Sequence, residues 1–306
     1  MHKGIYFSAN DSVYDWTLAF LRSFREYNPN LTLYLIPFDS NCNAIKGLSQ
    51  EFDFGIYEDS ASFEELEELG AAFELGHSEY GKYWFRRYAA FWGPLDVFMY
   101  LDCRQLILAD LNSVLNVIEN DDVDFMYYDL AIDQVYEPGE VRKNFLLKKG
   151  GRGFNSGRWA ARKHLFSKAE LLQLGYEALN YRDQLNPRNT DQAFINYCID
   201  KKPNLKTVHL KEYLGNYIQQ GWAGQKGRLY KEGKTVYWWD YGGLEHKKKV
   251  MLLHWAGYGW NDALPQEKWL NRYSKPSFTT KIIRKINLAK KKIKGNYKFR
   301  RFLGNV

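Results

Sequence analysis

The stretch MYLDCRQLILADL, Met99–Leu111, carries an acid and a base at a position suited to chemistry. Its apolar residues predict a β-strand that ends at Asp102, and Arg104 follows two residues later. In an open α/β sheet, ligands bind outside the carboxyl ends of the strands. An acid at that edge could hold a ribose, and a guanidinium binds phosphate oxygens through two parallel hydrogen bonds. The alternative for Asp102 is a turn acid or a helix cap.

Other candidate residues lie near predicted strand ends or in glycine-rich segments. The polar loop Ala9–Tyr14 follows the first predicted strand and should open onto the same sheet edge as Asp102. His254 ends a late apolar strand, where it is either a site residue or a satisfied core histidine. Three tryptophans in polar surroundings could stack on the sugar rings of an acceptor, or belong to the core: Trp222, Trp238 and Trp239.

These side chains need a framework of alternating strands and helices. Residues 4–37 read as strand, amphipathic helix and strand, which predicts a parallel βαβ unit. Helices are then expected over 62–73, 79–93, 111–120, 167–179 and from near Thr190, and strands over 96–102, 123–129, 205–210 and 249–255. The alternation predicts an α/β, three-layer, Rossmann-like domain with a mainly parallel mixed sheet.

Charge is unevenly distributed along the 306 residues, whose formal net charge is +7. Thirteen lysines and arginines lie between Lys268 and Arg301, leaving 30 basic against 36 acidic residues in positions 1–267. No apolar run is long enough to span a bilayer, and the start of the sequence does not resemble a secretory signal. The three cysteines have no metal-ligand spacing. We therefore expect a cytoplasmic protein.

The basic C-terminal segment predicts an amphipathic helix. Apolar residues recur at spacings of three and four, at Phe278, Ile282, Ile286, Ala289 and Ile293. Gly295-Asn296 should end the helix. A tail at residues 277–303 could lie on an anionic membrane surface such as the inner face of the plasma membrane, or dock on the body. Nucleic acid is not expected as a partner. The predicted domains are 1–265 and a tail at 266–306.

Several short motifs, in order, resemble those of glycosyltransferases with the GT-A fold. The resemblance covers residues 3–260 and is greatest to glycosyltransferase family 8, which includes bacterial lipooligosaccharide galactosyltransferases and glycogenin. The matching segments are FSANDSVYDWTLAFLRSFREYNP, YWFRRYAAF, the D-x-D-like MYLDCRQLILADL, FNSG, TDQAFIN and HWAG. The resemblance implies transfer of a sugar from a nucleotide-sugar, most often a UDP-sugar, to a glycan or glycolipid, with retention of configuration.

The resemblance also implies roles for individual residues. Asp102 would be the first D-x-D acid, beside the ribose and diphosphate of the donor. Asp191 and Gln192 would bind hydroxyls of the transferred sugar. The remaining donor-site residues would be Ala9, Asn10, Asp11 and Tyr14 for the nucleoside, Arg86 or Arg87 for the phosphates, Asn155 and Gly157 for the sugar, and His254 for the diphosphate or its metal.

Two departures from the family pattern affect the same chemical task. Arg104 replaces the second D-x-D acid, and Trp260 stands where the family has a phosphate-binding lysine. These changes place the Mn²⁺ or Mg²⁺ of the family in doubt, because Asp102 and His254 would be its only ligands among these motifs. Arg104 either replaces the metal at the leaving diphosphate, or pairs with Asp102 or Asp110 in a degenerate, non-catalytic protein that binds a nucleotide-sugar or a glycan.

Overall fold

The computed structural model describes residues 1–75, 78–120, 122–128, 132–148, 153–185, 191–218, 221–240, 242–244 and 246–303. The strands are β1 (Lys3–Ala9), β2 (Thr32–Pro37), β3 (Gly55–Ile56), β4 (Val97–Asp102), β5 (Gln105–Ile107), β6 (Phe125–Tyr127), β7 (Arg158–Arg162), β8 (Thr207–His209), β9 (Arg228–Glu232), β10 (Thr235–Trp239), β11 (Lys248–Lys249) and β12 (Leu252–His254). The α-helices are α1 (Tyr14–Tyr27), α2 (Asn43–Lys46), α3 (Ser60–Ala72), α4 (Asn112–Asn120), α5 (Glu140–Lys148), α6 (Lys168–Ala178), α7 (Gln192–Lys201), α8 (Leu210–Tyr213), α9 (Glu267–Tyr273) and α10 (Phe278–Leu303). The 3-10 helices are η1 (Asp11–Val13), η2 (Ser78–Trp92), η3 (Ile132–Gln134) and η4 (Leu179–Tyr181).

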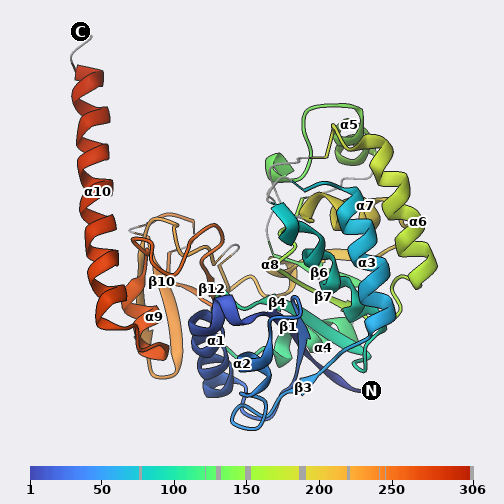
Figure 1. Ribbon diagram of the computed structural model, residues 1–306, viewed down its shortest axis with the longest axis horizontal. Helices are drawn as coiled ribbons and strands as arrows, with labels where there is room; N and C mark the ends of the chain where they lie inside the picture. Colours follow the sequence, from blue (N-terminus) through green and yellow to red (C-terminus); the bar gives the residue numbers. More distant parts are fainter. Residues whose placement is uncertain are drawn as a thin grey trace.

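A seven-stranded mixed sheet forms the centre of the molecule, with the order β3-β2-β1-β4-β7-β6-β8 (Figure 1). Strands β1 to β4 are mutually parallel where they pair, and β7 runs antiparallel to both of its neighbours. The opening βαβ unit is therefore as predicted. Two smaller sheets are separate from the central sheet, a three-stranded β11-β10-β9 sheet and the antiparallel pair β12-β5.

Residues that alternate along the central strands enter two separate cores. Ile5 and Phe7 of β1 are buried in one cluster with Phe20 of α1. Tyr6 is buried on the opposite face with Phe63 of α3. Because a strand presents successive side chains to opposite faces, this arrangement places one helix layer on each side of the sheet. The predicted three-layer α/β architecture is confirmed.

The predicted aromatic helix at 79–93 is a 3-10 helix, η2, in the structure. A 3-10 helix has three residues per turn, so side chains three apart lie on one face. Phe85, Tyr88 and Phe91 fall on that face and are fully buried in the core beside α3. The same repeat separates the neighbouring side chains of Arg86 and Arg87 by about 120°.

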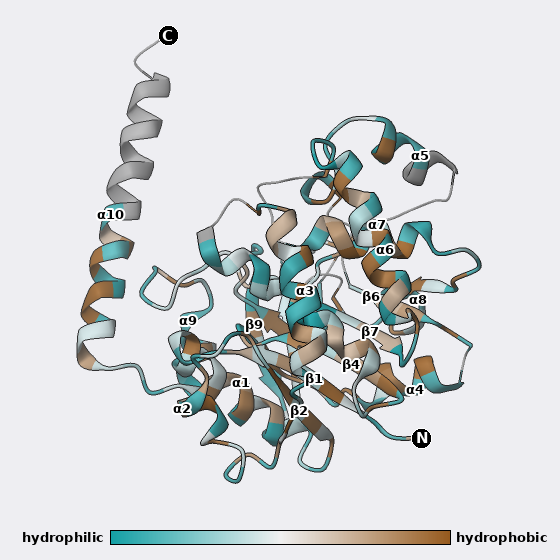
Figure 2. Ribbon diagram, turned by 45° about the vertical axis from the view of Figure 1, so that its right-hand side comes forward, coloured by the Kyte–Doolittle hydropathy of each residue, from teal (hydrophilic) through white to brown (hydrophobic). Residues whose placement is uncertain are grey.

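A third core joins the smaller sheet to the C-terminal region. Trp238 of β10 and Trp269 of α9 are buried there with Trp16 of α1. Residues 267–273 therefore pack with the body, beyond the expected domain boundary at 265. The first turns of helix α10 contact the body, where Arg284 is buried beside Trp260, and they carry both hydrophobic and hydrophilic residues (Figure 2).

Helix α10 differs from its predicted bounds, because it continues through Gly295-Asn296 to Leu303. The glycine does not end the helix, since a single glycine in a helix interior costs only about 1 kcal/mol. The predicted start of a helix near Thr190 lies outside the described residues; α7 is described from Gln192. No helix in the described ranges combines the length and the apolar character required for a membrane span.

Candidate active site

A cavity of about 660 Å³ opens at the carboxyl ends of β1 and β4, and we call it the strand-end cavity. Ser8 and Asp102 are directly paired in the parallel register of these strands, and both line the cavity. The lining continues through Ala9 and Asn10 to Arg104. This is the sheet edge at which open α/β proteins bind ligands, and the volume is in the range of small-molecule sites.

The loop after β1 contributes unequally to the cavity. Asn10 lines it and donates a hydrogen bond from Nδ2 to Oδ2 of Asp39 at 2.6 Å. The carboxylate of Asp11 instead accepts the backbone N–H groups of Ala44 and Ile45, at 3.1 and 3.0 Å. Asp11 therefore holds the start of α2, and neither Asp11 nor Tyr14 is among the cavity-lining residues. For these two residues, nucleoside binding stays a prediction.

Sequence reasoning missed several lining residues. Asp39 follows the carboxyl end of β2, so the strand-end rule that selected Asp102 would also have selected it. The aromatic side chains of Tyr83 and Trp84 on η2 also line the cavity. They supply flat apolar surface of the kind that a nucleoside base stacks against.

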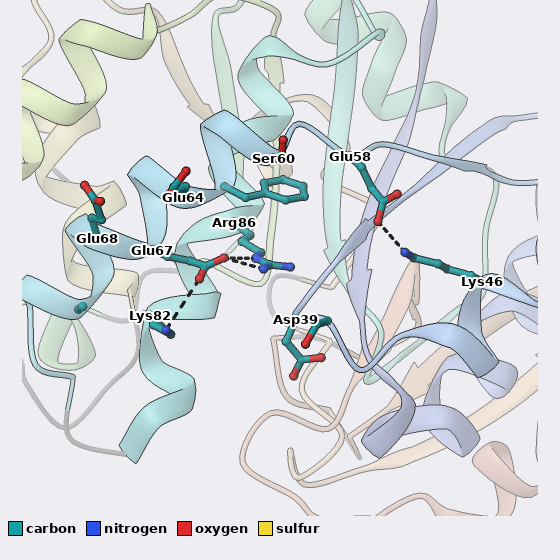
Figure 3. Close-up of a pocket in the computed structure, with 12 residues that line it drawn as sticks. Asp39, Lys46, Glu58, Ser60, Glu64, Glu67, Glu68, Lys82 and Arg86 are labelled. Atoms are coloured by element: carbon teal, nitrogen blue, oxygen red, sulfur yellow. Dashed lines mark hydrogen bonds and ion pairs between the residues drawn. The ribbon is translucent and has the colours of Figure 1, made fainter.

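Arg86 points away from the strand-end cavity into a second cavity of about 770 Å³, the α3 cavity (Figure 3). Its Nε and Nη2 each lie 2.6 Å from Oε1 of Glu67 on α3. Figure 3 shows this pair beside Lys82, with Asp39 at the border that the two cavities share. The 120° step of η2 is consistent with this separation, and of the two candidates for the donor phosphates, Arg87 is the one that lines the strand-end cavity.

Arg87 lines the strand-end cavity and lies between two carboxylates. Its Nη1 is 3.5 Å from Oδ1 of Asp102, and its Nε is 3.2 Å from Oδ2 of Asp191. Nη1 also donates to the backbone oxygen of Ser156 at 3.1 Å. Burial alone would lower the pKa of Arg87, but the two carboxylates raise it above its usual value. The guanidinium is permanently charged, and its single positive charge is shared by the two acids.

Asp102 remains partly open, with 23% of its side chain exposed. Tyr100 donates a hydrogen bond from its hydroxyl to Oδ1 at 3.0 Å. Burial raises the pKa of Asp102, but the charges of Arg87 and then His254 and Arg104 outweigh burial and hold the pKa below its usual value. The carboxylate is therefore ionised at neutral pH.

Gly157 allows the close approach of β7 to Asp102. The backbone N–H of Asp102 donates to the Gly157 carbonyl at 2.8 Å. A Cβ at position 157 would lie within 3.0 Å of Oδ2 of Asp102. Asn155 accepts the Gly157 N–H at 2.9 Å through Oδ1, which fixes the turn before β7. The structure thus brings Asn155 and Gly157 beside Asp102, although neither lines the cavity.

Asp191 lies at the N-terminus of α7 with a side chain that is 0% exposed. Tyr88 donates a hydrogen bond to its Oδ2, and Ser156 donates one to Oδ1 at 3.2 Å. The adjacent Gln192 is also buried and accepts the Ser156 N–H at 3.3 Å. Both acid and amide are engaged with protein groups in this conformation, and neither lines the cavity.

His254 is buried behind Asp102 on β12, opposite Gln105 of β5. Burial, and then the positive charge of Arg158, lower its pKa to about 3, although Asp102 acts in the opposite direction. The imidazole is therefore neutral at physiological pH. Trp222 forms a bridge to His254 through the backbone and is 40% exposed. Its ring lies 6.4 Å from that of Tyr258, whose carbonyl contacts Arg104, although Trp222 is not among the cavity-lining residues.

The other two tryptophans have different environments. Trp238 is fully buried and donates a hydrogen bond to the carbonyl of Lys226 at 3.2 Å, so the expectation that it stacks on an acceptor is corrected. Side chains alternate along β10, and the half-buried Trp239 lies on the opposite face. There its ring lies 6.0 Å from that of Tyr230 and 4.3 Å from that of His246.

Arg104 lines the strand-end cavity and is half-buried. Its Nη1 donates one long hydrogen bond, 3.5 Å, to the carbonyl of Tyr258. Asp110, the alternative partner, accepts instead from the side chain and backbone of Asn112. Within the described ranges no ion pair joins Arg104 to an acid. Trp260, in the place of the family lysine, packs on Trp16 with ring centres 4.9 Å apart.

The fit of a divalent cation depends on converging oxygen or nitrogen ligands. Asp102 and His254 supply one carboxylate and one imidazole, and Arg104 occupies the place of the second acid. Among the residues that the structure describes, no cluster of three or more His, Cys, Asp or Glu could hold a metal ion. The positive charges of Arg158, Arg104 and Arg87 act on His254 and would repel a dication. These residues do not fit Mn²⁺ or Mg²⁺.

Comparison with known proteins identifies the fold of the chain. No family model matches the sequence, and no curated protein matches it. The galactosyltransferase LgtC, solved with donor and acceptor sugar analogues, has 12% identity and a TM-score of 0.57 over 88% of this chain and 93% of LgtC. The bifunctional glycosyltransferase WbbM has 12% identity and a TM-score of 0.55 over 93% of this chain and 51% of WbbM.

The chain has the GT-A fold. An active-site mutant of LgtC agrees, with 12% identity and a TM-score of 0.55 over 90% of this chain and 97% of that chain. The fold expected from the D-x-D-like and accompanying motifs is thus confirmed. Within this GT-A fold, the strand-end cavity lies at the edge formed by β1 and β4.

Proposed function

We propose that this GT-A protein is a glycosyltransferase that moves a sugar from a UDP-sugar to a hydroxyl group of a glycan or glycolipid. The observation that carries the proposal is the strand-end cavity, in which Asp102 faces a ligand-sized space with Arg87 and Arg104 on its wall. Retention of anomeric configuration and UDP as the nucleotide rest on the resemblance to family 8. Transfer without a divalent cation is supported by the misfit of the metal ligands.

The donor would bind along the length of the cavity. The nucleoside would occupy the part lined by Asn10, Asp39 and the aromatic residues of η2, where amide and carboxylate groups meet flat rings. The diphosphate would lie toward Arg104 at the other part of the lining. The sugar would then approach Gly157 and Asp191, whose network holds the position of Asp102. Catalysis would arise from positioning and from stabilisation of the departing diphosphate.

The acceptor would contact exposed aromatic rings. Trp222 is the stronger candidate, because it is exposed and its ring lies 6.4 Å from that of Tyr258, which contacts Arg104. Trp239 is the second, on the aromatic face of the β9-β10 sheet with Tyr230 and Tyr237. An aromatic face provides apolar surface to a pyranose ring, and the neighbouring polar groups can bind its hydroxyls.

The C-terminal helix would hold the enzyme on an anionic membrane surface, the inner face of the plasma membrane. Phe278, Ile282 and Ile286 are exposed on α10, and Lys281 and Lys285 are exposed beside them. Such a helix inserts its apolar side chains at the headgroup level while its lysines contact anionic lipids. Binding of this kind weakens with salt.

The test of the proposed activity is donor turnover by the purified protein. Incubation with a panel of UDP-sugars should release UDP slowly by hydrolysis, and faster when a glycan acceptor is added. The replacement of the second acid by Arg104 favours one alternative, a protein that binds the donor without turning it over. Binding of UDP without hydrolysis or transfer for any donor would establish that alternative. Absence of binding to any nucleotide would contradict both.

A further inference from the structure

Arg86, Arg87 and Arg104 differ in their pairings, whereas Arg158, which also lies near the carboxyl end of β4, is buried and is not among the cavity-lining residues. Arg86 is engaged with Glu67 in the α3 cavity. Arg87 is engaged by Asp102 and Asp191, and its side chain is only 7% exposed. Arg104 is the third, and it lines the strand-end cavity without an acidic partner among the described residues. Their different pairings decide which guanidinium can meet an incoming anion.

We infer that Arg104 binds the leaving diphosphate of the donor and takes the place of a divalent cation, an inference that rests on the proposed function. Within the described ranges its side chain makes one hydrogen bond, the 3.5 Å contact with the Tyr258 carbonyl, which an anionic oxygen can readily replace. A guanidinium offers a planar fork of donors that matches two phosphate oxygens. Arg104 is therefore a catalytic residue, whereas Arg87 is a positioning residue for Asp102.

The charges at the site agree with the replacement of a divalent cation by Arg104. Two D-x-D carboxylates and one dication sum to zero charge, and Asp102 with the guanidinium of Arg104 gives the same sum. Arg87 adds little net charge, because Asp191 lies 3.2 Å from its Nε and compensates it. A dication added to this wall would face Arg104 and Arg87 without a second carboxylate to hold it, so the arginine and the metal are alternatives.

The sugar-transfer step needs only this stabilisation of the leaving diphosphate by Arg104. The bond between the anomeric carbon and the diphosphate oxygen breaks, and its electron pair stays on that oxygen. The acceptor oxygen forms the new bond to the same carbon, and the acceptor proton passes to the diphosphate oxygen. Arg104 would stabilise the negative charge that develops there, at a position where a preorganised donor has its largest effect.

Nucleotide binding tests this assignment without reference to turnover. Affinities for UDP and for uridine are measured by calorimetry in chelator and in Mn²⁺, for the wild type and for Arg104→Met. The wild type should bind UDP equally well in both buffers. Arg104→Met should weaken UDP binding by about ten- to a hundredfold, the usual effect of one charge-assisted hydrogen-bonding group, and leave uridine binding unchanged. Retained uridine binding also shows that the variant is folded.

Two further variants sharpen the test. Arg86→Met is the matched control, because it removes the neighbouring guanidinium from the other cavity and should leave UDP affinity within about twofold of wild type. Arg104→Asp recreates the two-acid spacing and should bind UDP weakly in chelator but more tightly with Mn²⁺. Wild-type binding that depends on Mn²⁺ would overturn the inference, as would equal losses of UDP and uridine affinity in Arg104→Met. Neither result would contradict sugar transfer itself, whereas failure to bind any nucleotide would.

Discussion

Nε of Arg87 lies 3.2 Å from Oδ2 of Asp191, and neither side chain is more than 7% exposed. The same guanidinium reaches Asp102 at 3.5 Å, so one cation links the strand-end acid to the acid at the start of α7. Breaking a buried pair by removing one partner leaves an uncompensated charge. Through Arg87, the position of Asp102 therefore depends on Asp191, which comes from a distant part of the chain.

Replacing Arg87 by Met should reduce the free energy of unfolding by about 3–5 kcal/mol, because two buried carboxylates lose their counter-charge. Urea denaturation followed by circular dichroism measures the change. Arg86→Met is the control, since its partner Glu67 is 19% exposed and regains solvation more readily. A loss below about 1 kcal/mol for Arg87→Met would show that the buried pairs contribute nothing to stability.

Gly157→Ala should displace Asp102, since the added Cβ would lie within 3.0 Å of its Oδ2. Misplacement of a catalytic group by about 1 Å can reduce turnover about a hundredfold. We expect a loss of that order in donor hydrolysis with little change in melting temperature beyond the local strain. Gly259→Ala is the matched control, because its nearest neighbour, Oδ2 of Asp262, is at an ordinary 3.4 Å. Equal activities of the two variants would contradict a role for the close approach at position 157.

His254 should make the protein less stable in acid. Its pKa is about 3 in the folded state and about 6.5 when unfolded, so the unfolded chain binds the extra proton between these values. Stability contributed by the neutral imidazole is therefore complete above about pH 6.5 and falls toward pH 3, by up to about 1.4 kcal/mol per pH unit. In His254→Gln, urea denaturation at several pH values should give a smaller loss between pH 6.5 and 4. An unchanged slope would show that another group controls this range.

Basic residues of α10 should divide into two functional classes. Arg284 is 2% exposed, donates to the Trp260 carbonyl at 2.8 Å and lies 3.0 Å from Glu267. Arg284→Met should lower the free energy of unfolding by about 1–3 kcal/mol and leave membrane affinity intact. The exposed lysines should behave in the opposite way. In Lys281→Gln/Lys285→Gln, the loss of about 2 kcal/mol of lipid attraction should weaken sedimentation with anionic vesicles about thirtyfold.

A reversed result, with vesicle binding lost in Arg284→Met and retained in the double lysine variant, would contradict membrane contact through the exposed face. Neutral vesicles provide the second control, because the electrostatic part of the attraction is absent there. Wild-type binding that is equal for neutral and anionic vesicles would show that the lysines have no role.

Trp222→Ala should raise the KM for a glycan acceptor and leave donor hydrolysis unchanged. The indole is exposed and makes no contact that supports Asp102 or Arg87 among the interactions of the described residues. Loss of the stacking surface of one indole ring raises KM by about tenfold. Tyr176→Ala is the control, an aromatic on α6 that is 50% exposed against 40% for Trp222. Parallel losses in acceptor use and donor hydrolysis would make Trp222 a structural residue.

Strand-end reasoning predicted the parts of the site that depend on chain order. Asp102 and the loop after β1 could be found because parallel strands place their carboxyl ends at one edge, and Asp39 follows from the same rule at β2. The buried face of β10 could not be identified in the same way, because Trp238 is flanked by the aromatic residues Tyr237 and Trp239 and the strand shows no apolar–polar alternation there.

Other features of the site required three dimensions. Arg86 and Arg87 are adjacent in sequence, and the sequence does not show which cavity each one lines, because that depends on how η2 packs against α3 and β4. Asp191 was expected at a helix start, where it lies, but its complete burial depends on Tyr88 and Ser156 from other segments. Arg284 shares the lysine-rich pattern of α10, and only the path of the helix across Trp260 buries it.

The order of the chain has a consequence for its synthesis. Among the described residues, those that line the strand-end cavity come from the first 104 positions, yet β7 and β12 stabilise that wall much later in the sequence. A nascent chain emerging from the ribosome would hold these lining residues well before Gly157, Asp191 and His254 are made. Its unpaired strand edges would therefore be exposed to other chains during translation, and we expect chaperone dependence to be greatest in that interval.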